Sequence, residues 1–105
     1  MPPIKAIVSW PATSPVPVVH PDPIPVRKGS GATVIQWTCG DGVATFKISG
    51  LDPAVFRPSA SKDFANNFST TDANEVAQMC TYEVSATRAT GGTVAHDPRI
   101  ENGGK

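Results

Sequence analysis

The chain has no long hydrophobic run, because a proline or a polar residue interrupts every apolar stretch. A helix that crosses a bilayer needs about 20 mostly apolar residues, so no membrane span is expected. Residues 1–10 hold one lysine and only short apolar pieces, which is unlike a secretory signal. We therefore expect a cytoplasmic or virion-associated protein rather than a secreted one.

An excess of charge of either sign is also missing. Nine Lys and Arg balance nine Asp and Glu, and no basic run could follow a phosphate backbone, so nucleic acid is not an expected partner. Hydrophobic residues make up 39% of the chain and charged residues 17%, which is typical of a folded protein. Since 105 residues suffice for one core, the sequence predicts a single domain over residues 1–105.

Proline is abundant but confined, since residues 2–25 hold eight of the eleven prolines. Proline removes a backbone donor and breaks helices, and in sheets it is found at edges and bulges. The sequence therefore predicts a proline-rich arm over residues 1–28, with an edge strand over residues 4–10 that blunts a sheet margin. The alternative is a flexible arm that docks in an aromatic groove of a partner.

Strands are predicted where β-branched and aromatic residues alternate with polar ones: residues 33–39, 43–49, 80–87 and 93–96. Gly40-Asp41-Gly42 predicts a hairpin between the first two, and Gly91-Gly92 another turn. Residues 54–77 are irregular and are expected to form a long crossover; a helical turn over 71–79, capped by Asp72, is an alternative. The positions expected to point inward are Ile35, Trp37, Cys39, Ala44, Phe46, Ile48, Cys80, Tyr82, Val84 and Ala86.

Six or seven strands with a turn about every ten residues, and no sustained amphipathic helix, predict an all-β fold: an antiparallel two-layer Greek-key sandwich. A resemblance agrees with this, and it rests on the segments 34–37 (Val-Ile-Gln-Trp), 80–84 (Cys-Thr-Tyr-Glu-Val) and 97–103 (Asp-Pro-Arg-Ile-Glu-Asn-Gly). Their order resembles small bacterial β-sandwich proteins of cupredoxin-like or Ig-like architecture that end in an Asp-Pro-x-Ile-x-Asn segment. The resemblance implies a sandwich of that type.

The cupredoxin comparison raises the question of copper, which such folds hold through two His, a Cys thiolate and a weak Met. The chain has these residue types, but no His lies between Cys80 and His96 and no Met follows Cys80. Neither Cys-x-x-Cys nor His-x-His spacing occurs, so structural zinc is not expected. The sequence predicts no metal and no cofactor, with a small metal or redox protein as the alternative. The residues of the right type are Met1, His20, Cys39, Met79, Cys80 and His96.

Motifs of catalysis are missing as well. There is no Gly-x-Ser-x-Gly elbow, no phosphate-binding glycine loop and no His-Glu-x-x-His. Both cysteines lie in phase with core residues, where thiols are usually inert. The protein is not expected to be an enzyme.

Cys39 and Cys80 are expected to lie side by side. If the strand that holds Trp37 pairs antiparallel with the strand that holds Tyr82, the end of the first lies opposite the start of the second. The two cysteines would then form a disulfide in an oxidising compartment.

These features predict a non-catalytic binding or structural module that presents loops and sheet edges to a protein or polysaccharide partner. A virion or surface decoration domain is one such module. Phe56, Phe64 and Phe68 are the candidate binding residues, because exposed aromatic rings that lie together mark an interaction surface.

Overall fold

The computed structural model describes residues 3–105, and these form strands and connections without a helix. Residues 1 and 2, the first two of the expected arm, lie outside the described residues. The prediction of an all-β fold is confirmed. The strands are β1 (Ile4–Ser9), β2 (Val18–His20), β3 (Ile24–Val26), β4 (Thr33–Cys39), β5 (Thr45–Ser49), β6 (Phe56–Arg57), β7 (Asn67–Asp72), β8 (Gln78–Thr81), β9 (Glu83–Thr87), β10 (Thr93–His96) and β11 (Arg99–Asn102).

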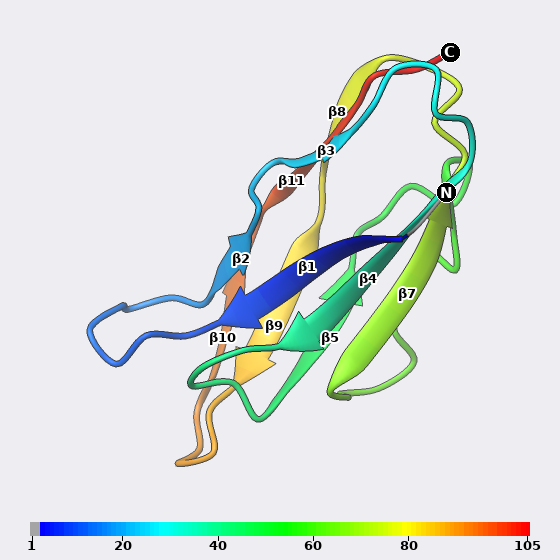
Figure 1. The fold of residues 1–105 in the computed structure, drawn as a ribbon. Coiled ribbons are helices and arrows are strands. Elements are labelled where there is room, and N and C mark those ends of the chain that lie inside the picture. Colours follow the sequence, from blue (N-terminus) through cyan, green and yellow to red (C-terminus); the bar gives the residue numbers. More distant parts are fainter. Residues whose placement is uncertain (1–2) are drawn as a thin grey trace.

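The strands form three sheets. One has five strands in the order β2-β1-β4-β7-β6, and the others have three each, in the orders β10-β9-β5 and β3-β11-β8. The two small sheets share two continuous chain segments, residues 78–87 and 93–102. The first segment forms β8 and β9, which only Tyr82 separates, and the second forms β10 and β11. The amide of Tyr82 donates to the carbonyl of Pro98 over 3.1 Å, which links the two segments across the break. In Figure 1, β1, β4 and β7 run side by side and β9 passes behind β1.

Two strand pairs are parallel, which corrects the expected antiparallel sheets. β1 runs parallel to β4, and β3 runs parallel to β11, while the remaining pairs are antiparallel. The expected position of the first strand was also wrong, because β1 lies inside its sheet between β2 and β4. The chain turns back after β1 and adds β2 outside it, as one edge of the five-stranded sheet. β3 is an edge strand of a different sheet, and Pro21 and Pro23 lie between β2 and β3.

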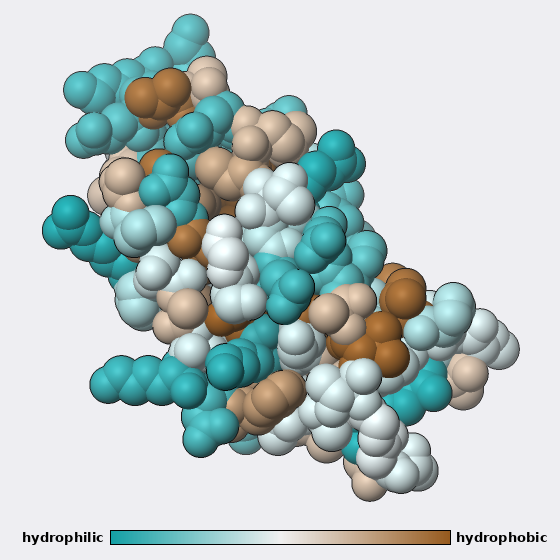
Figure 2. Space-filling view, turned by 180° about the vertical axis from the view of Figure 1, so that it is seen from behind, coloured by the Kyte–Doolittle hydropathy of each residue, from teal (hydrophilic) through white to brown (hydrophobic). Residues whose placement is uncertain are grey.

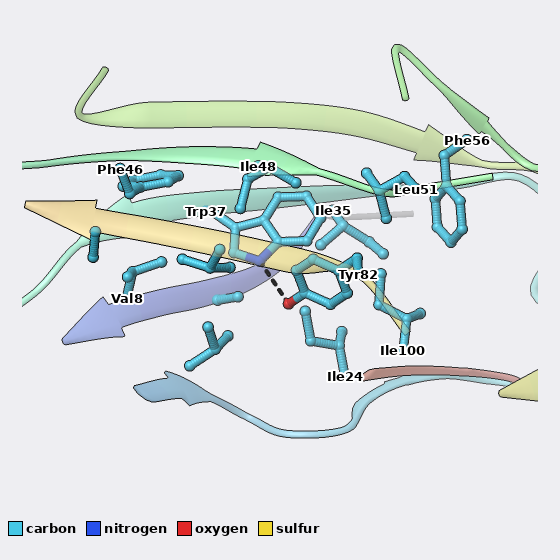
Figure 3. Close-up of a cluster of buried hydrophobic side chains, with 14 of the residues drawn as sticks. Val8, Ile24, Ile35, Trp37, Phe46, Ile48, Leu51, Phe56, Tyr82 and Ile100 are labelled. Atoms are coloured by element: carbon cyan, nitrogen blue, oxygen red, sulfur yellow. Dashed lines mark hydrogen bonds between the residues drawn. The ribbon is translucent and has the colours of Figure 1, made fainter. Parts of the chain in front are cut away.

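The core is one cluster of buried side chains, to which strands of all three sheets contribute. Trp37 of β4 is fully buried, and its ring centroid is 5.6 Å from that of Tyr82 (Figure 3). Phe46, Ile48 and Phe56 close the same cluster. Burying a large apolar side chain stabilises a fold by about 1.5–3 kcal/mol, so these residues carry much of the driving force for folding.

The predicted alternation holds in β9, where Val84 and Ala86 are buried and Glu83 is exposed. The hairpin predicted at Gly40-Asp41-Gly42 is wrong, because β4 and β5 belong to different sheets and residues 40–44 cross between them. Gly42 has φ +81°, and a Cβ atom there would collide with the carbonyl oxygen of Trp10.

Residues 43–49 also start their alternation later than expected. Val43 is buried and Ala44 is exposed, the reverse of the prediction, because both residues still belong to the crossing and β5 begins only at Thr45. The alternative of a helical turn over residues 71–79 is wrong too, since β7 continues to Asp72 and β8 begins at Gln78. The Asp72 carboxylate accepts from the amide of Asn74 over 2.9 Å and so closes a turn rather than a helix.

Candidate functional site

The three phenylalanines expected at a binding surface lie in different environments. Phe56 has no exposed surface, and Phe68 is partly buried with its ring centroid 5.7 Å from that of Trp37. The side chain of Phe64 is 41% exposed. The rings therefore do not form one exposed aromatic patch, and Phe64 is the most exposed of the three.

Other exposed apolar side chains are scattered. They come from several strands and connections, and on the face shown in Figure 2 the brown groups are separated by teal and white ones. An interface recognised by hydrophobicity alone needs a continuous patch of several hundred Å². A recess with mixed chemistry is therefore the better candidate on this surface. The exposed large apolar residues are Ile7, Val18, Val34, Phe64, Val76 and Met79.

One such recess is a groove between residues 58–65 and strand β7. Its volume is about 440 Å³, which lies in the range of sites that hold small ligands or short chain segments. Residues 58–65 supply one wall and β7 supplies the other. The wall from the connection contains Pro58, Ala60, Ser61, Lys62, Asp63 and Ala65, and the wall from β7 contains Asn67, Phe68 and Ser69.

The outer wall of the groove is fixed by hydrogen bonds at both ends. The hydroxyl of Thr70 donates to the carbonyl of Pro58, at 2.6 Å. Further along, the amide of Ser61 donates to the carbonyl of Ile48 over 2.8 Å, and Ala65 exchanges two backbone hydrogen bonds with Phe46. The connection thus leaves the margin of β7, crosses to the outer edge of β5 and returns to β7. The groove is the space enclosed by this excursion.

The inner wall is a strand edge. β4 pairs with β7 along its whole length, but β6 pairs only with Thr71 and Asp72. Within residues 3–105, no strand pairs with the second edge of β7 from Asn67 to Thr70. An unpaired edge presents backbone N–H and C=O groups that can pair with another extended chain.

The side chains of the groove can bind but are poorly equipped for chemistry. Lys62 and Asp63 are exposed charges of opposite sign, Asn67 brings an amide, and Phe68 brings an aromatic ring. The hydroxyl groups come from serines, and no histidine or cysteine lines the groove to activate them. Hydrogen bonding and apolar contact are what this set of residues offers.

Cys39 and Cys80 are free thiols, so the expected disulfide is not present in the structure. β4, which ends at Cys39, pairs with β1 and β7, whereas β8, which contains Cys80, pairs with β11. The expected antiparallel pairing of the Trp37 and Tyr82 strands is therefore wrong. The rings of Trp37 and Tyr82 pack edge to face in the core, with 66° between their planes, and the two residues are not neighbours within a sheet. The two cysteines belong to different sheets.

The two thiols also have different neighbours. Cys39 Sγ donates a weak hydrogen bond to the carbonyl of Ala44 at 3.6 Å, whereas Cys80 lies opposite Ile100. Burial raises the pKa of Cys39, and it raises the pKa of Cys80 with smaller additions from the charges of Asp72 and Asp52. Both sites thus disfavour the thiolate, which is the nucleophilic and metal-binding form.

The metal-ligand types named from the sequence do not gather into a site in the described part of the chain. His96 Nε2 lies 3.9 Å from the Asp22 carboxylate, and Met79 is 47% exposed on β8. In residues 3–105, no three His, Cys, Asp or Glu side chains lie close enough together to hold a metal ion. His20 lies on β2, and Met1 lies outside the described residues.

A second recess, of about 410 Å³, lies where residues 10–12, 41–42 and 88–90 meet. The guanidinium of Arg88 lies 4.1 Å from the ring centroid of Trp10 and donates to the carbonyls of Pro11 and Ser14, at 3.0 and 3.2 Å. The indole Nε1 of Trp10 also donates to Ser14, at 3.0 Å. The Trp10 ring already contacts Arg88, its N–H already donates a hydrogen bond, and its side chain is only 5% exposed. We therefore interpret these contacts as holding the loop at residues 11–14 in place, not as a ligand site.

Sequence reasoning missed most of the groove. It named Phe68 and the neighbouring Phe64 as candidate binding residues, but gave no binding role to Lys62, Asp63 or Asn67, because residues 54–77 carry no periodic pattern. One signal was present: the run 59–69 is rich in Ser, Asn, Asp and Lys around two phenylalanines. That composition is typical of a surface loop with functional side chains.

Comparison with known proteins assigns no function to the site. No model of a protein family matches the chain, and a search of curated proteins found no significant match. Within residues 3–105 there is no helix of the length and apolarity that crossing a membrane requires.

Proposed function

We propose that the protein is a non-catalytic binding module that holds an extended peptide segment of a partner protein in the groove beside β7. The observation that carries this proposal is the coincidence of the groove with the unpaired edge of β7 from Asn67 to Thr70. Addition of a strand to an open edge is a common mode of peptide recognition, in which backbone hydrogen bonds supply affinity and adjacent side-chain sites supply specificity.

The remaining side chains fit an extended peptide. Phe68 offers an apolar contact for one side chain of the peptide, while Lys62 and Asp63 offer charges of both signs at the outer wall. The outer wall is held to β5 by backbone hydrogen bonds, so the groove is formed before the ligand arrives. A preformed site loses less conformational entropy on binding than a mobile one.

The architecture proposed with this function is a two-layer sandwich of Ig-like or cupredoxin-like type. The five-stranded sheet would be one layer, and the two three-stranded sheets, joined through Tyr82 and Pro98, would be the other. The Trp37–Tyr82 contact across the core supports this arrangement. In such a framework the groove lies at the side where the margins of the two layers face each other.

The test is selection of linear peptides from a random display library on the immobilised protein, with a glycan array in parallel. Selected peptides should shift the backbone amide resonances of residues 67–70. The variant Ala60→Trp fills the groove from its exposed wall and should weaken binding by more than about tenfold, or about 1.4 kcal/mol.

The matched control is Ala89→Trp, which places the same bulk on an exposed alanine outside this groove and should leave binding intact. Equal binding by Ala60→Trp would overturn the groove as the site. Binding of glycans without any peptide would replace the proposed partner with a polysaccharide.

A further inference from the structure

Three buried polar side chains meet where the end of β7, the turn at residues 27–30 and the C-terminal segment come together. Asp72 is 0% exposed, Asn74 1% and Asn102 3%. Asp72 Oδ1 accepts two hydrogen bonds, from the amide of Asn74 at 2.9 Å and from Asn102 Nδ2 at 3.0 Å. Polar side chains so deeply buried are normally fully hydrogen-bonded, so each of their atoms needs a partner.

Asn74 meets this requirement. Its Nδ2 donates to the carbonyl of Arg27 at 2.9 Å and to the hydroxyl of Ser30 at 3.1 Å, and its Oδ1 accepts from the amide of Gly104 at 2.9 Å. The side chain thus ties the turn at residues 27–30 to the C-terminal segment. Asn74 has φ +51°, a conformation that asparagine adopts more readily than most residues.

Two oxygens of the cluster lack a partner. Asp72 Oδ2 and Asn102 Oδ1 are buried and accept no hydrogen bond from any group in residues 3–105. A buried acceptor without a partner destabilises the fold, and the cost is larger if the acceptor carries charge. These two oxygens belong to the same two side chains that the hydrogen bond from Asn102 Nδ2 to Asp72 Oδ1 already joins. An ionised carboxylate and an amide oxygen are both acceptors, so while Asp72 is ionised neither of these two oxygens can donate to the other.

We propose that Asp72 is protonated on Oδ2 in the folded protein and donates that proton to Asn102 Oδ1, so that the two side chains form a doubly hydrogen-bonded acid–amide pair. A single proton gives both unpaired oxygens a partner and removes the buried negative charge. The pair joins the end of β7 to the end of β11 and so holds the C-terminal segment in place. Because the pair needs a protonated Asp72, this link is stronger at low pH.

The surroundings of Asp72 favour the neutral form. Its register partners are Thr33 on β4 and Phe56 on β6, neither of which is charged. On β8, the titratable neighbour is the thiol of Cys80, which is neutral at moderate pH. No cation in residues 3–105 forms an ion pair with Asp72. Burial therefore dominates and raises the pKa of Asp72, against the lowering effect of the hydrogen bonds from Asn74 and Asn102.

The nearby charged side chains lie outside the cluster. Arg57 follows Phe56 on β6 and is exposed, and Arg27 reaches the cluster through its backbone carbonyl. Lys28 and Glu101 are exposed as well. The Asp72 carboxyl group therefore titrates within a neutral cluster, and the charge that it would acquire has no counter-charge beside it.

The pH dependence follows from this assignment. The folded pKa of Asp72 is raised above the unfolded value, which is near the ordinary 3.8, so the folded state binds more protons between these two values. The contribution of Asp72 to stability is complete below the unfolded pKa and is lost as the pH rises through the folded pKa.

The test compares the wild-type protein with Asp72→Asn, whose amide mimics the protonated acid by donating to Asn102 Oδ1. Melting temperatures are measured from about pH 3 to about pH 8, and the difference between the two proteins isolates Asp72 from other titrating groups. The wild type should lose stability relative to the variant as the pH rises, and the variant should be at least as stable at neutral pH. The control is Asp97→Asn, which replaces an exposed carboxylate and should follow the wild-type curve.

A wild type that gains stability over Asp72→Asn as the pH rises would show that Asp72 is ionised in the fold and would overturn the proposal. Carboxyl carbon resonances of the wild-type protein, followed by NMR, give a second readout that needs no variant. The Asp72 resonance should titrate above the ordinary aspartate range. Titration at or below that range would equally reject the acid–amide pair.

Discussion

The indole Nε1 of Trp37 donates a hydrogen bond to the hydroxyl of Tyr82 over 3.1 Å, and both side chains are buried. Trp37 belongs to the five-stranded sheet, and Tyr82 is the residue between β8 and β9 (Figure 3). Because each group is the other's partner in an apolar core, loss of one leaves the other without compensation.

Tyr82→Phe should therefore destabilise the protein by about 1–3 kcal/mol, since the indole N–H would stay buried without an acceptor. Urea denaturation measures the loss. A double-mutant cycle with Trp37→Phe should show a positive coupling between the two residues. A change in Tyr82→Phe of less than about 0.5 kcal/mol, within the range of neutral surface substitutions, would contradict this account.

Tyr82 should also report alkaline unfolding. Burial raises its pKa well above the ordinary value of 10.0, with the hydrogen bond from Trp37 acting in the opposite direction. The folded state thus keeps a proton that the unfolded state releases near pH 10, so stability falls as the pH rises above that value. Tyr82 is the one tyrosine in the chain, and its tyrosinate absorbance should appear together with the loss of the folded circular dichroism signal. Tyrosinate that forms near pH 10 in folded protein would refute the prediction.

Arg88→Met should loosen the loop at residues 11–14. The substitution keeps the apolar stem but removes the cation that lies over Trp10 and the donor to Pro11 and Ser14. We expect a loss of about 0.5–2 kcal/mol and a red shift of tryptophan fluorescence, measured by denaturation and emission spectra. Arg99→Met, which alters an exposed side chain on β11, is the control and should change neither quantity.

Both thiols should titrate in denatured, unreduced protein, because neither Cys39 nor Cys80 is bridged. In the folded protein each should react with a thiol reagent more slowly than free cysteine at neutral pH, since burial raises both pKa values above the ordinary 9.0. Cys39→Ser and Cys80→Ser assign the two rates. A denatured protein without reactive thiols would show that the cysteines are bridged after all.

The strands that were predictable are those with one buried face. In β4 and β9, Ile35, Trp37, Val84 and Ala86 alternate with polar residues, and this period fixes both the strand and its inward side. Which sheet each strand joins was not predictable, because Gly40-Asp41-Gly42 fits a hairpin turn as well as a crossing between sheets. Pairing is decided by contacts between distant residues, and a local pattern does not encode them.

The site was harder to predict than the fold. Phe56 and Phe64 both lie in irregular sequence, yet Phe56 is buried and Phe64 is exposed. Without an alternation of apolar and polar residues, the sequence does not indicate which of the two side chains points inward. The groove depends on how Ser61 and Ala65 bond to β5, and these are backbone contacts that any side chain would permit. A helix cap was an alternative prediction for Asp72, because aspartate is favoured at the N-cap position, and nothing in the local sequence indicated its burial.

The parallel pairing of β3 with β11 also affects how the chain folds while it is being synthesised. Ile24 pairs with Ile100, a residue close to the other end of the chain. β3 therefore has no strand beside it until residues 99–102 have been made. Contacts of such long sequence separation slow folding. On the ribosome, the edge that β3 later occupies therefore does not exist until β11 has been made, and residues 24–26 stay unpaired during that interval.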